Sequence, residues 1–296
     1  MFSEVDFVGR WRLWFAISGV VILVGILAIA LGNLQFGIDF EGGTKFTVTS
    51  PQRQLGEEEV RAALPDFVAG DAVVQTAGEG GYEIRTPVLD ERERNQVEEA
   101  LGESLGGEIS VTSVSPTFGG QVRDQALQAV AAALIIIVAF ISIRFEFAFA
   151  LAAMVALVHD ILVTIGFYAI VGREVSLVTV VAVLTVLGYS LYDTIIIFDR
   201  VRENTPSVGY NRRRFDQTVN TSIRQVVRRS IYTSVCSLIP ITALLIFGET
   251  TLADFAFALL VGIGAGTYSS IFIASPILSL YKAWRAGRLR QAPRSA

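Results

Sequence analysis

Long apolar runs separated by short charged links occupy most of the chain, and this pattern predicts six membrane-spanning helices. A helix needs about 20 apolar residues to cross a hydrocarbon core about 30 Å thick. The first run exceeds the roughly 7–15 residues of a signal-peptide core, so we expect a retained helix and not a cleaved leader. The predicted spans are residues 13–31, 126–143, 147–170, 177–198, 230–247 and 255–281.

Between the first two runs the pattern changes to the short segments of a soluble domain. Alternating apolar and polar residues predict strands, and acidic starts followed by helical spacing predict helices. The resulting order β-α-β-β-α-β is the ferredoxin-like split βαβ pattern. The predicted strands are residues 45–49, 71–76, 82–86 and 109–114, and the predicted helices are residues 56–64 and 90–105.

These patterns predict an α-helical polytopic membrane protein with six transmembrane helices and one α+β (ferredoxin-like) domain between the first two. A composition of 52% hydrophobic and 18% charged residues is typical of this class. The predicted parts are an N-terminus with the first helix (1–32), the ferredoxin-like domain (33–122), five further helices (123–281) containing a basic loop (199–229), and a basic tail (282–296).

The distribution of arginines predicts the orientation in the membrane. Arginines gather in the loop 199–229 and in the tail 282–296, and the positive-inside rule places both in the cytoplasm. An even number of spans then puts the N-terminus inside as well and the 33–122 domain on the extracytoplasmic side. Orientation beside lipid headgroups explains the basic residues, so we expect no nucleic-acid partner.

The sequence does not predict an enzyme. The 33–122 domain has no histidine, no cysteine and no nucleophile–base spacing. Cys236, the one cysteine, falls in an apolar run and is expected to pack as a small hydrophobic residue. No second histidine or cysteine accompanies His159, so neither a metal site nor a cofactor is expected.

The fourth predicted span carries a carboxylate, Asp193, roughly 7 Å inside the hydrocarbon edge at helical rise. An ionisable group at this depth costs several kcal/mol unless it is neutralised, paired or hydrated, so we interpret Asp193 as part of an ion or proton pathway. The alternative is an aspartate hydrogen-bonded to a neighbouring helix. Tyr189 and Ser190, at i−4 and i−3 on the same face, are its predicted hydrogen-bond partners.

His159 and Asp160 lie near the middle of the third span. Consecutive residues point about 100° apart on a helix, so either one orients the other or each meets a separate neighbour. The histidine is either a packed core residue or part of a proton-linked pair.

Arg228 and Arg229 lie at a depth similar to Asp193, where an arginine either pairs with the carboxylate or extends to the headgroups.

Glycines bracket the external domain and mark one helix face. Gly37, Gly42 and Gly43 on entry, and Gly119–Gly120 on exit, are interpreted as hinges or as ordinary membrane-surface turns. In the last span, Gly262-x-x-x-Gly266 predicts close contact with another helix.

Five motifs occur in one order along nearly the whole chain. They are residues 36–44 with Asp39, residues 158–160, residues 188–204 with Gly188, Thr194, Asp199 and Arg200, residues 229–234, and residues 266–272 with Gly266. Together they resemble the SecF family, membrane subunits of the bacterial Sec protein-export machinery.

The resemblance implies a partner, SecD, and a bacterial plasma-membrane location. The SecD–SecF pair is similar to transporters of the resistance-nodulation-division type. It uses the proton gradient to pull preproteins out of the SecYEG channel after ATP-driven insertion by SecA. Asp193 and Arg229 match the family's aspartate and arginine in the proton path, and the external domain would handle emerging preprotein. Tyr192 stands where family members often have asparagine.

Two other functions stay open at this point. One is half of a small-molecule or lipid exporter of the same superfamily, although such exporters usually carry twelve helices and two large external domains. The other is a scaffold that assembles Sec components without transport. The coupling ion also stays open, because a carboxylate with nearby hydroxyls suits a proton or sodium.

Overall fold

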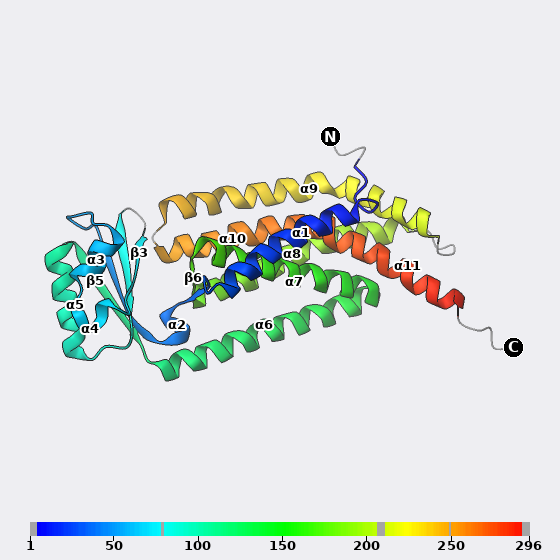
Figure 1. Cartoon of the computed structure of the whole chain (residues 1–296). Coiled ribbons are helices and arrows are strands. Elements are labelled where there is room, and N and C mark those ends of the chain that lie inside the picture. Colours follow the sequence, from blue (N-terminus) through cyan, green and yellow to red (C-terminus); the bar gives the residue numbers. More distant parts are fainter. Residues whose placement is uncertain (1–4, 78–79, 206–210, 249, 292–296) are drawn as a thin grey trace.

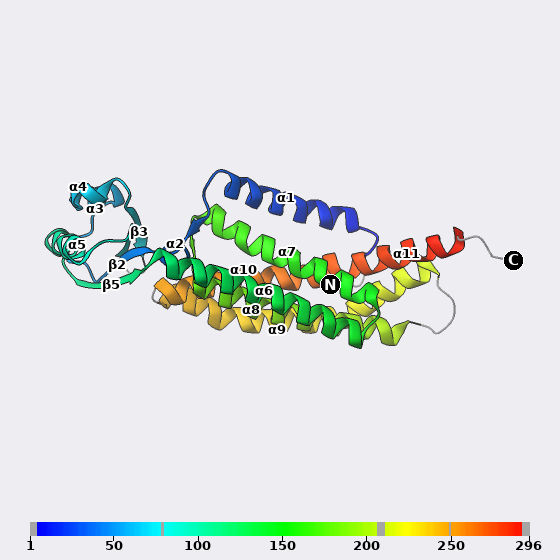
Figure 2. The same cartoon turned by 90° about the horizontal axis from the view of Figure 1, so that it is seen from below.

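The computed structural model describes residues 5–77, 80–205, 211–248 and 250–291. A small α+β domain stands at one end of a bundle of long helices, which gives an elongated molecule (Figure 1; Figure 2). Within the described residues, six helical segments are long and apolar enough to cross a membrane. They are α1 (Trp11–Ala30), α6 (Pro116–Arg144), α7 (Phe147–Val171), α8 (Leu177–Asn204), α9 (Arg212–Phe247), and a composite of α10 (Thr250–Ser269), the π-helical turn η1 (Ser270–Ala274) and α11 (Ser275–Gln291).

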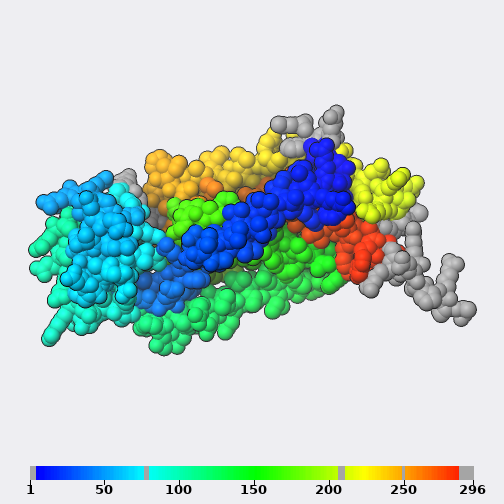
Figure 3. Space-filling model, viewed as in Figure 1, coloured from blue at the N-terminus to red at the C-terminus, as the bar shows by residue number. Residues whose placement is uncertain are grey.

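The bundle has an inner and an outer set of helices. α10 packs against α7, α8 and α9, whereas α1 packs along α7 and crosses one face of the bundle diagonally (Figure 3). The outer helices α1, α6 and α9 expose large apolar side chains such as Ile143 and Phe247, which are 88% and 85% exposed. Apolar surface of this extent requires lipid or another protein against it.

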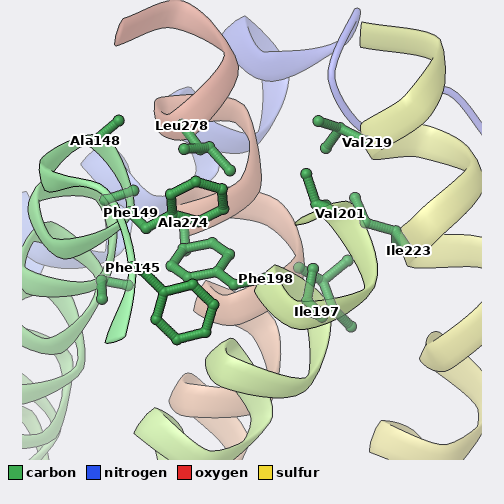
Figure 4. Close-up of a cluster of buried hydrophobic side chains, with 14 of the residues drawn as sticks. Phe145, Ala148, Phe149, Ile197, Phe198, Val201, Val219, Ile223, Ala274 and Leu278 are labelled. Atoms are coloured by element: carbon green, nitrogen blue, oxygen red, sulfur yellow. The ribbon is translucent and has the colours of Figure 1, made fainter. Parts of the chain in front are cut away.

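An aromatic core joins the helices at the end of the bundle away from the sheet. The rings of Phe149 and Phe198 lie 5.1 Å apart, and Phe145 packs beside both (Figure 4). Val219 and Ile223 bring the first half of α9 into the same core. This packing extends α8 and α9 as ordered helices beyond their apolar segments.

The α+β domain contains one antiparallel four-stranded sheet in the order β3-β4-β2-β5. The strands are β2 (Gly43–Thr49), β3 (Val73–Ala77), β4 (Gly81–Thr86) and β5 (Glu108–Val114), and the helices are α3 (Glu57–Ala63), α4 (Asp66–Ala69) and α5 (Glu91–Ser104). Phe46, Ile84, Val97 and Leu101 are fully buried between sheet and helices. Asp90 caps α5 through the backbone N–H groups of residues 92 and 93.

A short junction ties this domain to the bundle. β1 (Gln35–Phe36) pairs in parallel with β6 (Glu174–Val175), which lies in the link between α7 and α8. The one-turn helix α2 (Ile38–Glu41) follows β1 and leads into the sheet. The entry to the domain is therefore attached to the membrane-spanning helices before the sheet begins.

Two predictions about irregular segments are wrong. Gly119 and Gly120 do not form a turn at the exit from the domain, because α6 begins at Pro116 and includes both. Ser115 caps this helix, and proline suits a first helical position. The basic segment 199–229 is not a loop over most of its length, since α8 continues to Asn204 and α9 begins at Arg212. Hydropathy marks where the apolar segment ends, while arginine-rich sequence continues as helix.

Candidate ion-pathway site

Asp160 on α7 is fully buried at the centre of a polar cluster inside the bundle. Its Oδ1 lies 3.0 Å from Nδ1 of the preceding residue, His159. Its Oδ2 accepts hydrogen bonds from the hydroxyls of Ser190 on α8, at 2.6 Å, and Ser269 on α10, at 2.9 Å. Partners from three helices thus offset the cost of burying this carboxyl group.

His159 extends the cluster toward α1. Its Nε2 lies 3.0 Å from Oγ of Ser18, whose hydroxyl lies 3.5 Å from the hydroxyl of Tyr268. The Tyr268 hydroxyl in turn donates to the carbonyl of Trp14 at 2.9 Å. A row of groups with exchangeable protons therefore runs from α1 to Asp160, an arrangement that suits a proton relay.

Asp193 on α8 lies in a second environment with fewer partners. Only 2% of this residue is exposed, and within the described residues its Oδ2 has no hydrogen-bond partner. Ser230 and Ser234 act on this carboxyl group as hydrogen-bonding groups and Arg229 acts as a positive charge, all three from α9. The contact between α8 and α9 therefore contains a buried carboxyl group that is not fully paired.

The predicted hydrogen-bond partners of Asp193 are wrong. Ser190 donates to Asp160, and the hydroxyl of Tyr189 donates to Ser237 on α9 at 3.3 Å. Spacing of i−3 and i−4 identifies residues on one side of a helix, but acceptors on neighbouring helices lie closer to both hydroxyls.

Arg229 is exposed in this single chain and does not pair with Asp193. Among the described residues no ion pair within 4.0 Å joins the two side chains, and the Arg229 guanidinium donates to the hydroxyl of Tyr192 at 3.3 Å. Tyr192 is itself 55% exposed. Arg229 and Tyr192 thus form an outward-facing polar pair beside the buried carboxyl group.

Thr194 links α8 to the π-helical turn in the last span. Its Oγ1 lies 2.8 Å from Oγ of Ser270, the first residue of η1. The Ser270 hydroxyl also donates to the carbonyl of Gly266 at 2.8 Å. π-Helical turns are rare and occur frequently at functional sites.

Glycines bring the helices of the cluster close together. A Cβ atom at Gly266 would lie 2.7 Å from Cβ of Ser190, and one at Gly262 would lie 2.4 Å from Cγ2 of Val186. The predicted close contact of the Gly262-x-x-x-Gly266 face is therefore confirmed. Gly188 differs, because a Cβ atom there would meet nothing within 4 Å.

The motif around Asp39 attaches the α+β domain to α8. Its Oδ2 accepts a 3.1 Å hydrogen bond from the backbone N–H of Leu177, the first residue of α8. A carboxylate at a helix N-terminus is favourable because it meets the positive end of the helix dipole. The N–H of Gly37 also donates to the carbonyl of Val175 at 2.9 Å.

Close packing accounts for the entry glycines. A Cβ atom at Gly37 would lie 2.0 Å from Oε1 of Glu174, and one at Gly42 would lie 2.7 Å from Cα of Pro116. Gly42 and Gly43 also adopt φ values of +78° and +134°, which favour glycine. Hinge motion at these three glycines stays a prediction.

A group of ion pairs surrounds the junction. Nε of Arg85 on β4 lies 3.1 Å from Oε2 of Glu174, and Arg173 pairs with Asp254 at the start of α10. Burial raises the pKa of the Glu174 carboxyl group, and the Arg85 guanidinium opposes part of that shift. A pocket of about 300 Å³ between domain and bundle has Glu83, Arg173, Glu174 and Asp254 among its lining residues.

The remaining motif residues lie at the end of α8 that is far from the sheet. Arg200 pairs with Glu203 at 2.8 Å and also donates to Gln225 on α9, while Asp199 is half-buried beside it. The hydrogen bond to Gln225 joins α8 to α9 away from Asp193. In the part of the chain that the structure describes, no group of three or more His, Cys, Asp or Glu side chains could hold a metal ion.

Sequence reasoning missed several hydroxyl-bearing residues of the site. Ser18 and Tyr268 extend the cluster from His159, Ser269 completes it, and Ser230 and Ser234 face Asp193. Four of them fall within the motifs 229–234 and 266–272, but the motifs do not show which acceptor each hydroxyl meets. Such a hydroxyl can also satisfy itself on its own helix, so the sequence alone does not identify its partner.

Six apolar helical segments with ionisable side chains buried between them define the class of multi-pass membrane proteins. The chain belongs to the SecD/SecF family, because the family model for the C-terminal part of the protein export membrane protein SecD/SecF matches residues 96–284.

Individual relatives agree with this assignment. The SecF protein translocase subunit of Streptomyces coelicolor is 36% identical over 283 residues, covering 93% of this chain and 76% of the relative. The SecF subunit of Thermodesulfovibrio yellowstonii is 37% identical over 286 residues, covering 94% of this chain and 95% of the relative.

A solved structure shows the same fold. The crystal structure of SecDF, a translocon-associated membrane protein from Thermus thermophilus, matches with a TM-score of 0.87 and 30% sequence identity. The match covers 96% of this chain and 39% of the SecDF chain. This chain therefore corresponds to a part of that longer protein.

Proposed function

We propose that the chain is an accessory, non-enzymatic subunit of the bacterial Sec translocase. In this role it pairs with SecD and uses the proton gradient for late-stage export of preproteins through SecYEG, after insertion by SecA. The main support for this proposal is a pair of buried carboxyl groups, Asp160 and Asp193, between the helices of a SecF-like fold. Buried ionisable groups at membrane depth are expensive, and ion pathways are the usual reason for them.

The two carboxyl groups suit different steps of coupling. Asp160, with His159, sits in a connected row of hydroxyl and imidazole groups that can pass a proton. Asp193 has an unpartnered Oδ2 next to α9, so it is placed to exchange a proton or to gain a partner when helices shift. Arg229, the residue directly before Ser230 on the same helix, supplies the nearest positive charge.

The longer SecDF chain supports the partnership with SecD. This chain matches 39% of SecDF, so a homologous assembly contains further protein beside these helices. Polar residues that face outward, Arg229 and Tyr192, would then meet the helices of SecD and not lipid. The Asp193–Arg229 ion pair, absent from the single chain, would form in one state of the assembled pair.

The α+β domain fits a ferredoxin-like fold on the extracytoplasmic side. Its strand order β3-β4-β2-β5 and its βαββαβ connectivity support that fold. The orientation rests on the arginines between 199 and 229, which favour the cytoplasm at the opposite end of the bundle. The bacterial plasma membrane is the expected location, with both termini in the cytoplasm.

Removal of the chain from cells separates this function from its alternatives. We expect depletion to slow the export of a model preprotein and to leave dye and drug efflux unchanged. Efflux lost with export unaffected would instead indicate a small-molecule exporter. A scaffold would lose assembly of SecD with SecYEG under the same depletion, which co-purification measures directly.

A further inference from the structure

The two edges of the sheet in the α+β domain differ in how they are protected. β3, one edge, is covered: the backbone N–H of Thr76 donates to Oε1 of Glu57 at 3.2 Å, and the Gln75 side chain contacts Gln35 and Gly172 at the junction. β5, the other edge, pairs only with β2. A sheet edge leaves every second backbone N–H and C=O directed outward, available to another strand.

β5 lacks the usual features that block an edge. It is seven residues long, Glu108–Val114, with neither proline, lysine nor arginine, and it contains four β-branched residues. Its register with β2 is continuous from Val114 to Glu108, so no bulge interrupts the edge. Natural sheets usually protect long edges by such means.

A groove runs beside the first half of β5. It is shallow and open, with a volume of about 510 Å³, and lies between α5 and the strand. One side of the groove is formed by Asn95, Glu98 and Glu99, which share one face of α5. The other side is formed by Gly107 and Ile109. An edge strand beside a helix is the geometry in which an extended peptide adds as a further strand.

The charge of the groove indicates the chemistry of its ligand. Residues 90–108 contain seven acidic and two basic side chains, and Glu98 and Glu99 are exposed on the groove wall. Acidic walls attract basic side chains and disfavour acidic ones. The half-buried Ile109 offers an apolar contact on the strand side of the groove.

We propose that the β5 edge and the α5–β5 groove bind an extended, unfolded polypeptide segment that carries lysine or arginine. The segment adds to the sheet as a fifth strand through backbone hydrogen bonds, and its basic side chains lie against Glu98 and Glu99. This inference rests on the proposed export function, because an unfolded chain on the extracytoplasmic side is then the available ligand. It assigns the external domain a direct contact with that chain.

The test uses the full chain in detergent, alone and with SecD, and a fluorescent twelve-residue peptide of alternating lysine and valine. We expect saturable binding to both preparations. A Glu98→Lys/Glu99→Lys variant should weaken it about tenfold, the size expected from two exposed charge reversals. The control Glu58→Lys/Asp71→Lys, which changes exposed acids elsewhere in the same domain, should leave binding unchanged.

Backbone pairing has its own test. Alternate backbone N–H groups of the added strand point to opposite edges, so one peptide is N-methylated at its odd-numbered residues and a second at its even-numbered residues. We expect the peptide whose methyl groups face β5 to lose binding and the other peptide to retain it. Equal binding of both, no binding of the unmodified peptide, or no effect of the double reversal would each overturn the proposal. Binding that SecD abolishes would assign the edge to SecD and overturn it too. These readouts need neither a gradient nor export, so they fail independently of the export function.

Discussion

The hydroxyl of Ser190 on α8 donates a 2.6 Å hydrogen bond to the carboxyl group of Asp160 on α7, not to Asp193 on its own helix. The α7–α8 contact is thereby coupled to Asp160, while Asp193 is left to face α9. A change of protonation at either carboxyl group would act on a different helix contact. This separation is the structural basis for the following predictions.

Ser190→Ala removes a hydrogen bond to a fully buried group, so we expect a loss of about 1–2 kcal/mol in stability. Thermal unfolding of the purified complex with SecD measures this loss. Ser142→Ala on the exposed side of α6 is the matched control and should change little. Equal unfolding temperatures for Ser190→Ala and the native protein would show that the bond contributes nothing.

Gly266→Ala places a Cβ atom 2.7 Å from Cβ of Ser190, which forces α10 away from α8. We expect destabilisation of about 1–3 kcal/mol, the usual cost of overpacking, and weaker gradient-stimulated export. Gly264→Ala in the same helix is the control, because a Cβ atom there meets nothing within 4 Å. Similar behaviour of the two variants would contradict the close α8–α10 contact.

Glu174 makes the junction sensitive to pH. Burial raises its pKa above the ordinary 4.5, so the folded state binds its proton more tightly than the unfolded state. The protonated Glu174 carboxyl group therefore contributes fully to the free energy of unfolding below about pH 4.5. This contribution is lost as the pH rises through the raised pKa. Glu174→Gln should flatten this part of the stability–pH curve, measured by thermal unfolding, while Glu58→Gln should not. An unchanged slope in Glu174→Gln would refute the assignment.

Arg229 is expected to act in coupling and not in folding. It is exposed in the single chain and contacts Tyr192, so Arg229→Met should leave topology and the amount of assembled complex intact. Gradient-stimulated preprotein export should nevertheless fall, whereas Arg228→Met should export normally. A fully active Arg229→Met protein would mean that the arginine only reaches the headgroups.

The sequence predicted most helices and strands within a few residues, because apolar runs and strand alternation are strong local signals. It failed where helices extend past the membrane: α6 and α9 continue through polar sequence that hydropathy excludes. The added part of α9 packs on the aromatic core around Phe198 through Val219 and Ile223, whereas the added part of α6 begins at the Ser115 cap near α2. Both are tertiary or capping contacts that hydropathy does not report.

The ionisable residues of the site were also predictable, since Asp160, His159 and Asp193 are conspicuous in apolar helices. Their partners were not. Ser190 satisfies i−3 spacing to Asp193 and yet bonds to Asp160, because the glycine-mediated α8–α10 contact and the position of α7 decide which acceptor is nearest. Ser18 contacts His159 from a helix 141 residues away in sequence.

Preprotein export into inverted vesicles that contain this chain and SecD, with the proton gradient intact or collapsed, tests the central claim most directly. We predict that Asp193→Asn abolishes the gradient-dependent increment of export and retains the ATP-dependent part. Asp199→Asn, on the same helix but at its polar end, should keep both. An undiminished gradient-dependent increment in Asp193→Asn would contradict the role of Asp193 in coupling.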